Sequence, residues 1–203
     1  GVNHKGGWVR DGWSGWRGGR PLLSDYTEPA SEAGAGGHLK NIYNLYVYFW
    51  RWATWRVFDR FSSPGIVSFI TASSYLRGPG FVGMRQEMRK ATNEVHILDL
   101  EGDQRGARIT ENVFCITIPV CVGTLAASNP PNPAVAGRGY YRRVTGSREE
   151  KLAACSALRR LGDVNWVLVD GGLQAPLMSG GSTAYDSWPR LTDLFPWQHS
   201  GAQ

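Results

Sequence analysis

The chain has 203 residues, of which 42% are hydrophobic, and a formal net charge of +5. This length and hydrophobic content allow one domain with a sizeable core, or one domain and part of another. No apolar run reaches the roughly 18 residues of a membrane span, because Arg51 and Arg56 interrupt the longest candidate. We therefore expect no membrane partner and, without a signal peptide, a cytoplasmic protein.

The cysteines and histidines form no metal-binding pattern. Cys115, Cys121 and Cys155 lack a CxxC spacing and fit reduced thiols that are buried as small hydrophobic residues. The four histidines lie too far apart in the sequence to suggest a metal site. We therefore expect no metal.

The first regular element is predicted after a glycine-rich start. Residues 1 to 40 contain much of the glycine and no long periodic run, which predicts an extended loop. From Ile42, apolar residues at steps of three and four predict an amphipathic helix. The predicted apolar face contains Leu45, Tyr46, Phe49, Trp52, Ala53 and Val57, and the predicted polar face contains Asn44, Arg51 and Asp59.

Strands and helices then alternate. Residues 66 to 71 form a β-branched run after Pro64 and Gly65, which is typical of a strand buried in a parallel sheet. Helices are predicted at residues 84 to 91 and 148 to 161, and strands at 94 to 100, 116 to 125, 140 to 144 and 166 to 169. This alternation predicts an α/β fold.

Four segments resemble one protein family. They are NLYVYFWRWA at residues 44–53, GIVSFITASSYLRGPGFVGMR at 65–85, LDLEGD at 98–103 and ENVF at 111–114. Together they resemble the DNA methyltransferase region of type ISP restriction-modification enzymes, which are large bacterial proteins with a nuclease and a helicase-like motor. The flanking segments GGWVRDGWSGWRGG and LFPWQHSGAQ are also similar to that family.

The resemblance implies a fold and a division of the chain. The implied fold is α/β: the carboxyl-proximal half of a Rossmann-like methyltransferase sheet, followed by the start of a mixed α+β target recognition region. We expect residues 1–40 to form a loop segment rich in glycine and tryptophan. Residues 41–128 would form the methyltransferase half, and residues 129–203 a linker and the start of the target recognition region.

The resemblance also implies an activity. Adenine-specific enzymes of this family transfer a methyl group from S-adenosylmethionine to the exocyclic amine of adenine in double-stranded DNA. They need a glycine loop for the cofactor and an Asn-Pro-Pro-aromatic tetrapeptide for the flipped adenine. Neither motif is found in the sequence. The segment from Asn129 to Asn132 begins like the tetrapeptide, but it lacks the aromatic residue and is typical of an exposed turn.

We therefore expect a fragment with no catalytic residue of its own and no activity in isolation. The chain starts without methionine and stops in mid-pattern, which agrees with this expectation. The remainder of the parent polypeptide would supply the tetrapeptide and the cofactor loop.

One aromatic residue and one polar segment are candidate binding residues. In adenine aminomethyltransferases, a Val-Phe pair ahead of a strand places an aromatic ring over the flipped base, and Val113-Phe114 matches that pattern. The alternative is that Phe114 is a core residue at the start of a strand. Substrate-pocket candidates follow the strand at 66 to 71, where ligands bind in open α/β sheets. They are Ser73, Ser74, Tyr75 and Arg77.

A glycine motif offers an alternative function. Residues Gly78 to Gly83 match GxGxxG between a strand and a helix, and Asp99 ends the next strand, as in a nucleotide-binding oxidoreductase. Against this alternative, Ala72 to Arg77 separate the strand from the first glycine, whereas the fingerprint needs an immediate tight turn. Pro79 also fixes φ inside the loop.

Basic residues suggest a nucleic-acid partner. A cluster of them lies between residues 138 and 160, and its charge suits contacts to DNA phosphates. It consists of Arg138, Arg142, Arg143, Arg148, Lys151, Arg159 and Arg160. A solvated helix face is the alternative, and a DNA-binding module without enzymatic activity is a further alternative function. A second patch combines Arg10, Arg17 and Arg20 with Trp8, Trp13 and Trp16.

Overall fold

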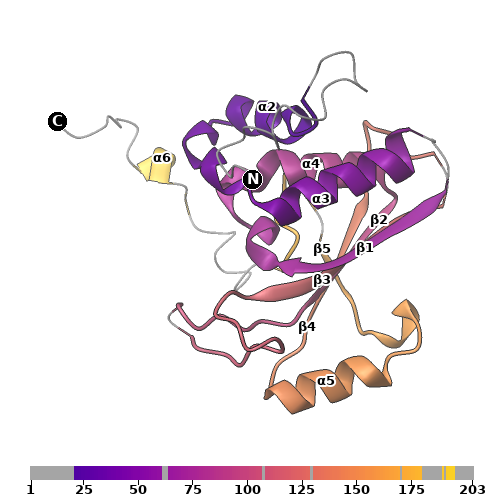
Figure 1. Ribbon diagram of the computed structural model, residues 1–203. Helices are drawn as coiled ribbons and strands as arrows, with labels where there is room; N and C mark the ends of the chain where they lie inside the picture. The colour runs from indigo at the N-terminus through magenta and orange to yellow at the C-terminus, as the bar shows by residue number, and fades with distance from the viewer. Residues whose placement is uncertain are drawn as a thin grey trace.

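A computed structural model describes residues 21–60, 64–106, 108–128, 130–169, 171–179, 189 and 191–194 (Figure 1). The strands are β1 (Gly65–Ala72), β2 (Glu94–Asp99), β3 (Val120–Ala127), β4 (Arg138–Arg143) and β5 (Val167–Val169). The α-helices are α2 (Ser24–Glu32), α3 (Leu45–Thr54), α4 (Val82–Ala91), α5 (Arg148–Ala157) and α6 (Leu191–Leu194). Short helical turns are η2 (Gly36–Asn41), η3 (Trp55–Asp59), η4 (Ser73–Leu76), η5 (Pro79–Phe81) and η6 (Leu161–Asp163). The predicted patch around Arg10, Arg17 and Arg20 lies outside the described residues, as does Asn129.

The strands form one mixed sheet in the order β1-β3-β2-β4-β5. β3 runs antiparallel to both of its neighbours, β1 and β2, whereas β2 and β4 are parallel. The prediction of an α/β fold is therefore confirmed. The expectation that residues 66 to 71 lie inside a parallel sheet is wrong, because β1 is an edge strand with Ile66 67% exposed and Ile70 54% exposed.

The sheet continues across the boundary that we expected at residue 129. β4 pairs with β2 from Glu94 opposite Arg138 to Asp99 opposite Arg143, and β5 pairs with β4. Residues 130–137 therefore connect two strands of one sheet, β3 and β4. β3 begins at Val120, four residues after the predicted start, because the preceding residues form a loop.

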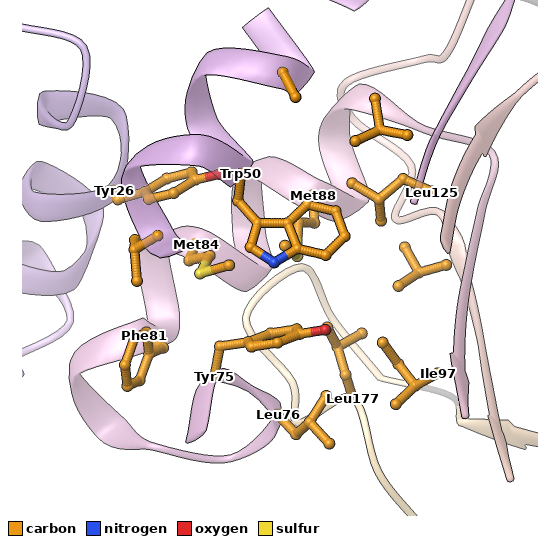
Figure 2. Close-up of a cluster of buried hydrophobic side chains, with 14 of the residues drawn as sticks. Tyr26, Trp50, Tyr75, Leu76, Phe81, Met84, Met88, Ile97, Leu125 and Leu177 are labelled. Carbon is orange, nitrogen blue, oxygen red and sulfur yellow. The ribbon is translucent and has the colours of Figure 1, made fainter. Parts of the chain in front are cut away.

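Helices cover both faces of this sheet unequally. α2, α3 and α4 lie on one face, and α5 lies on the other (Figure 1). Trp50 of α3 is at the centre of the larger core, above Tyr75 and beside Met84 and Met88 (Figure 2). Its indole N–H donates to Oγ1 of Thr71 on β1, at 3.2 Å, and its ring centroid lies 6.0 Å from that of Tyr75. This indole therefore ties α3 to the sheet.

The helix predicted from Ile42 is confirmed as α3, but its predicted faces are wrong. Phe49, expected to be buried, is 53% exposed, whereas Arg51, expected on the polar face, is 3% exposed. The Arg51 guanidinium bonds the Asp25 carboxylate of α2 and the Asp59 carboxylate of η3. Burial lowers the pKa of Arg51, but Asp59 and its other partners raise it on balance. Arg51 thus forms a buried ion pair where exposure to solvent was expected.

The described part of the predicted amino-terminal loop is also different from the expectation. Residues 24 to 32 are helical, and Leu22, Leu23 and Tyr26 are fully buried against the core. An extended loop was predicted because glycine is frequent there. α2 is stabilised by packing on α4 rather than by a periodic run of its own.

A smaller apolar cluster fills the other face of the sheet. Leu98, Leu100, Val113 and Val120 form its centre, beneath α5 and the residues that follow it. α5 begins at a capping box, in which the Ser147 side chain accepts from the Glu150 backbone N–H. Among the described residues, no helix is long and apolar enough to cross a membrane.

Candidate functional site

A polar pocket of about 440 Å³ lies where β1, β2 and β4 end and β3 begins. Three of the four predicted substrate-pocket residues line it, namely Ser73, Ser74 and Arg77. The structure adds charged and polar side chains to its wall: Asp99, Glu101, Asp103, Arg108, Thr110 and Arg143. The carboxyl ends of three strands thus form the site, as expected for an open α/β sheet.

Tyr75 is the predicted pocket residue that the structure places elsewhere. It is fully buried in the core, and its hydroxyl lies 3.3 Å from Sγ of Cys121 on β3. Burial raises the pKa of Tyr75 well above its usual value. Tyr75 is therefore a core residue beneath the pocket, and its prediction as a substrate-contacting residue is corrected.

Asp99 and Arg143 are joined through a tyrosine. The Tyr141 hydroxyl donates to Oδ2 of Asp99 at 2.6 Å, and Nε of Arg143 donates to the same hydroxyl oxygen at 3.0 Å. Burial raises the pKa of Tyr141, and the Asp99 carboxylate raises it further. Burial lowers the pKa of Arg143, but Tyr141, Asp99 and Glu101 raise it on balance. The network fixes one carboxylate and one guanidinium at the pocket wall.

Glu101 is a site residue in an uncommon backbone conformation. Its φ is +55°, in the left-handed region that residues with a side chain seldom adopt. One Glu101 carboxylate oxygen lies 3.0 Å from Nη2 of Arg108 and 3.8 Å from Nε of Arg143. Glu101 was not predicted as a site residue. The sequence feature that could have indicated Glu101 is the LDLEGD segment, in which acidic residues directly follow a buried strand.

Phe114 lies on the loop of residues 100–119, between β2 and β3. Its side chain is 52% exposed and precedes β3 by six residues, so the alternative of a core residue at a strand start is excluded. The same loop supplies Asp103, Arg108 and Thr110 to the pocket wall. An exposed aromatic ring and a charged pocket thus share one loop.

The predicted basic cluster does not form one surface. Lys151 is fully buried, and Arg143 belongs to the pocket wall. Arg148 donates from Nε to the backbone carbonyl of Val113 at 3.0 Å. The prediction that Lys151 contacts DNA phosphates is therefore wrong, as is its alternative as part of a solvated helix face.

The remaining arginines of the cluster are exposed on the α5 side of the sheet. Arg138 and Arg142 alternate along β4 with the inward-facing Tyr141, so their side chains point to the opposite face. Arg159 and Arg160 border a hollow on that same face, which Leu98 and Val122 also line. Arg160 bonds Asp163 at 3.0 Å.

The glycines of the GxGxxG segment serve helix packing. A Cβ at Gly80 would overlap the backbone carbonyl of His38, and one at Gly83 would overlap the backbone carbonyl of Tyr26. Protein therefore occupies the space where a dinucleotide fingerprint brings the pyrophosphate close to the backbone. This geometry argues against the oxidoreductase alternative. Among the described residues, no group of three or more His, Cys, Asp or Glu side chains is arranged to hold a metal.

Solved structures share this fold. The type ISP restriction-modification enzyme LlaGI, as a nuclease-deletion mutant in complex with a DNA substrate mimic, matches 77% of this chain with a TM-score of 0.64 and 18% identity. The ATP-dependent type ISP enzyme LlaBIII, bound to DNA, matches 77% with a TM-score of 0.65 and 22% identity. A DrdV–DNA complex matches 67% with a TM-score of 0.57 and 27% identity.

The resemblance seen in the sequence is thus confirmed as a likeness of fold to type ISP enzymes. The matched region covers 15% of the LlaGI chain, 10% of the LlaBIII chain and 13% of the DrdV chain. No protein-family model matches the sequence, and no curated protein matches it.

Proposed function

We propose that this chain is the DNA-facing, carboxyl-proximal part of an adenine-specific DNA methyltransferase within a restriction-modification enzyme. The complete enzyme would transfer a methyl group from S-adenosylmethionine to the exocyclic amine of an adenine in double-stranded DNA. The fold shared with LlaGI and LlaBIII, both bound to DNA or a DNA mimic, supports the assignment.

The observation that carries the proposal is the exposed ring of Phe114 on the loop that also lines the polar pocket. Exposing an aromatic ring to water is unfavourable, whereas an extruded base offers it a flat apolar face. Ser73, Ser74 and Arg77 line the pocket as donors for the polar edges of such a base.

We infer that the glycine segment of residues 78–83 does not hold S-adenosylmethionine. The backbone of His38 and of Tyr26 lies against Gly80 and Gly83 respectively, and the tetrapeptide that would hold the flipped adenine is not in the sequence. We therefore assign no step of methyl transfer to a residue of this chain. The cofactor would be held by the remainder of the parent polypeptide.

The outer edge of β1 has no partner strand among the described residues, which fits an arrangement with further polypeptide. β1 pairs with β3 on one side, and Ile66 and Ile70 are exposed. A further strand of the parent polypeptide would satisfy the backbone groups along this edge and cover the isoleucines.

We expect DNA binding that depends on salt through the exposed arginines. Replacing Arg142 and Arg159 by glutamate leaves DNA phosphates without a cation, so the slope of log affinity against log salt should fall by about one for each such phosphate. Fluorescence anisotropy with a labelled duplex at several salt concentrations measures this slope. The exposed Lys40 on η2 provides a control, since Lys40→Glu changes the net charge by the same amount as each arginine substitution. If Lys40→Glu weakens DNA binding as much as each arginine substitution does, the assignment is contradicted.

We also expect Phe114 to contribute to methylation by stacking. In a polypeptide that includes the cofactor loop and the tetrapeptide, Phe114→Leu keeps apolar bulk but loses the aromatic face. Stacking on a base is worth about 1–3 kcal/mol, so methyl transfer should fall by between about five-fold and about 150-fold. Thermal unfolding of the same variant should be unchanged because the ring is exposed. Methylation at the unsubstituted level, or a fall only in step with stability, would contradict base stacking.

A further inference from the structure

The backbone on both sides of Phe114 is held by one buried amide. Oδ1 of Asn112 accepts from the Phe114 backbone N–H at 2.8 Å. Nδ2 of the same side chain donates to the carbonyl oxygens of Ile118, at 2.7 Å, and Gly102, at 3.3 Å. Asn112 is 3% exposed, so water does not compete for these bonds. The ring is thus exposed while its backbone is fixed at both ends of the loop.

Helix α5 holds the same segment from outside. Nζ of Lys151 donates to the carbonyl oxygen of Glu111 at 2.7 Å, and Nε of Arg148 donates to the carbonyl oxygen of Val113 at 3.0 Å. The Arg148 backbone N–H donates to the Glu111 carboxylate at 2.7 Å. Two residues at the start of α5 therefore hold Glu111 and Val113, which precede Phe114, by hydrogen bonds.

The burial of Lys151 indicates a specific task. Its side chain is fully buried, and removing an ammonium group from water is costly unless it is paired. Its partners are the Glu111 carbonyl and the Glu101 carboxylate, whose Oε2 lies 3.8 Å away. We propose that Lys151 and Arg148 are positioning residues, which fix the direction in which the Phe114 ring points.

Lys151 also connects the ring to the pocket. Glu101 lines the pocket and is held there by Arg108, at 3.0 Å. The buried ammonium group of Lys151 therefore links the pocket wall to the segment before Phe114. This link would keep the position of the Phe114 ring constant relative to the pocket. The functional meaning of this link rests on the proposed contact between Phe114 and an extruded base.

The test measures the mobility of the loop without DNA. Cys115 is exposed and adjacent to Phe114, whereas Cys121 is buried with its pKa raised to about 12 by burial. A Cys155→Ala background removes the third thiol, so a nitroxide reagent labels Cys115. Electron paramagnetic resonance then compares Lys151→Met and Arg148→Met with the unsubstituted chain. We expect faster nitroxide motion, seen as a narrower central line, in both variants.

Arg159→Met is the matched control for mobility, because it removes an exposed positive charge just beyond α5 without touching the loop. Lys151→Met keeps an unbranched side chain that is one atom shorter, and Glu101 retains Arg108 and Arg143 as partners. Arg148 is exposed, so its replacement keeps the test valid if Lys151→Met does not fold. Lys151→Arg, which retains a donor, should restore slow motion.

Unchanged nitroxide motion in Arg148→Met and in folded Lys151→Met would overturn the proposal. A functional measurement separates this proposal from the proposed function. In the methylating polypeptide, loosening the loop should lower kcat more than it raises KM for DNA, because the ring acts on the extruded base. Increased motion with unchanged methylation would leave the positioning role intact and overturn the base contact of Phe114.

Discussion

Replacing Arg51 by methionine is expected to destabilise the chain by about 3–5 kcal/mol, the usual cost of removing one partner of a buried ion pair. The guanidinium is 3% exposed, and it joins α3 to Asp25 of α2 at 2.6 Å and to Asp59. Methionine keeps the apolar stem but leaves a buried carboxylate without this cation. Chemical denaturation followed by tryptophan fluorescence measures the change in the free energy of unfolding.

The control for Arg51 is Lys40→Met, which removes an exposed positive charge and should change stability by less than about 0.5 kcal/mol. A double variant, Arg51→Met with Asp25→Asn, should recover part of the stability, because the buried negative charge is then removed as well. Equal stability of Arg51→Met and Lys40→Met would show that the ion pair does not hold α2 on α3.

Replacing Gly83 by alanine is expected to have the second largest effect. In an unobstructed helix this change is favourable by nearly 1 kcal/mol. Here the new Cβ would overlap the carbonyl oxygen of Tyr26, which is backbone of α2 and cannot rotate away. We expect a destabilisation at or above the upper end of the ~1–3 kcal/mol that overpacking costs.

Gly37→Ala is the matched control for Gly83, because no atom lies within 4 Å of its added Cβ. It should be neutral or slightly stabilising. Thermal unfolding of both variants decides the role of the glycine motif. A stable Gly83→Ala chain, together with tryptophan quenching by NAD at micromolar concentration, would favour the oxidoreductase alternative over helix packing.

Local sequence patterns predicted the positions of helices and strands better than they predicted the burial and the partners of their side chains. Steps of three and four residues located α3 correctly, yet they assigned Arg51 to solvent. Its partner Asp25 lies 26 residues earlier in the sequence, and no local periodicity reports such a distant carboxylate. β1 was located from its β-branched run, but such a run is equally compatible with a central parallel strand and with an antiparallel edge.

The sequence predicted part of the candidate site correctly, but it assigned Lys151 the wrong role. Ser73, Ser74 and Arg77 follow a strand, and the rule that ligands bind at carboxyl ends of strands found them. Lys151 looked like a phosphate contact because charged residues are usually exposed. Its partner is the backbone carbonyl of Glu111, 40 residues earlier. Every residue has such a carbonyl, so the sequence cannot indicate which one binds Lys151.

The strand order has a consequence for how the sheet assembles. β1 pairs with β3 and not with β2, the next strand in sequence, so its first paired residue, Gly65, meets Ala127. β2 and β3 are closer in sequence, and the chain entropy lost in bringing strands together grows with the length of the intervening loop. We therefore expect β1 to join the β2-β3 pair late in folding, and its long-range contacts to slow the folding rate. Because β1 pairs with one strand, β3, among the described residues, we expect local unfolding of the sheet to expose its amide hydrogens to exchange before those of β2.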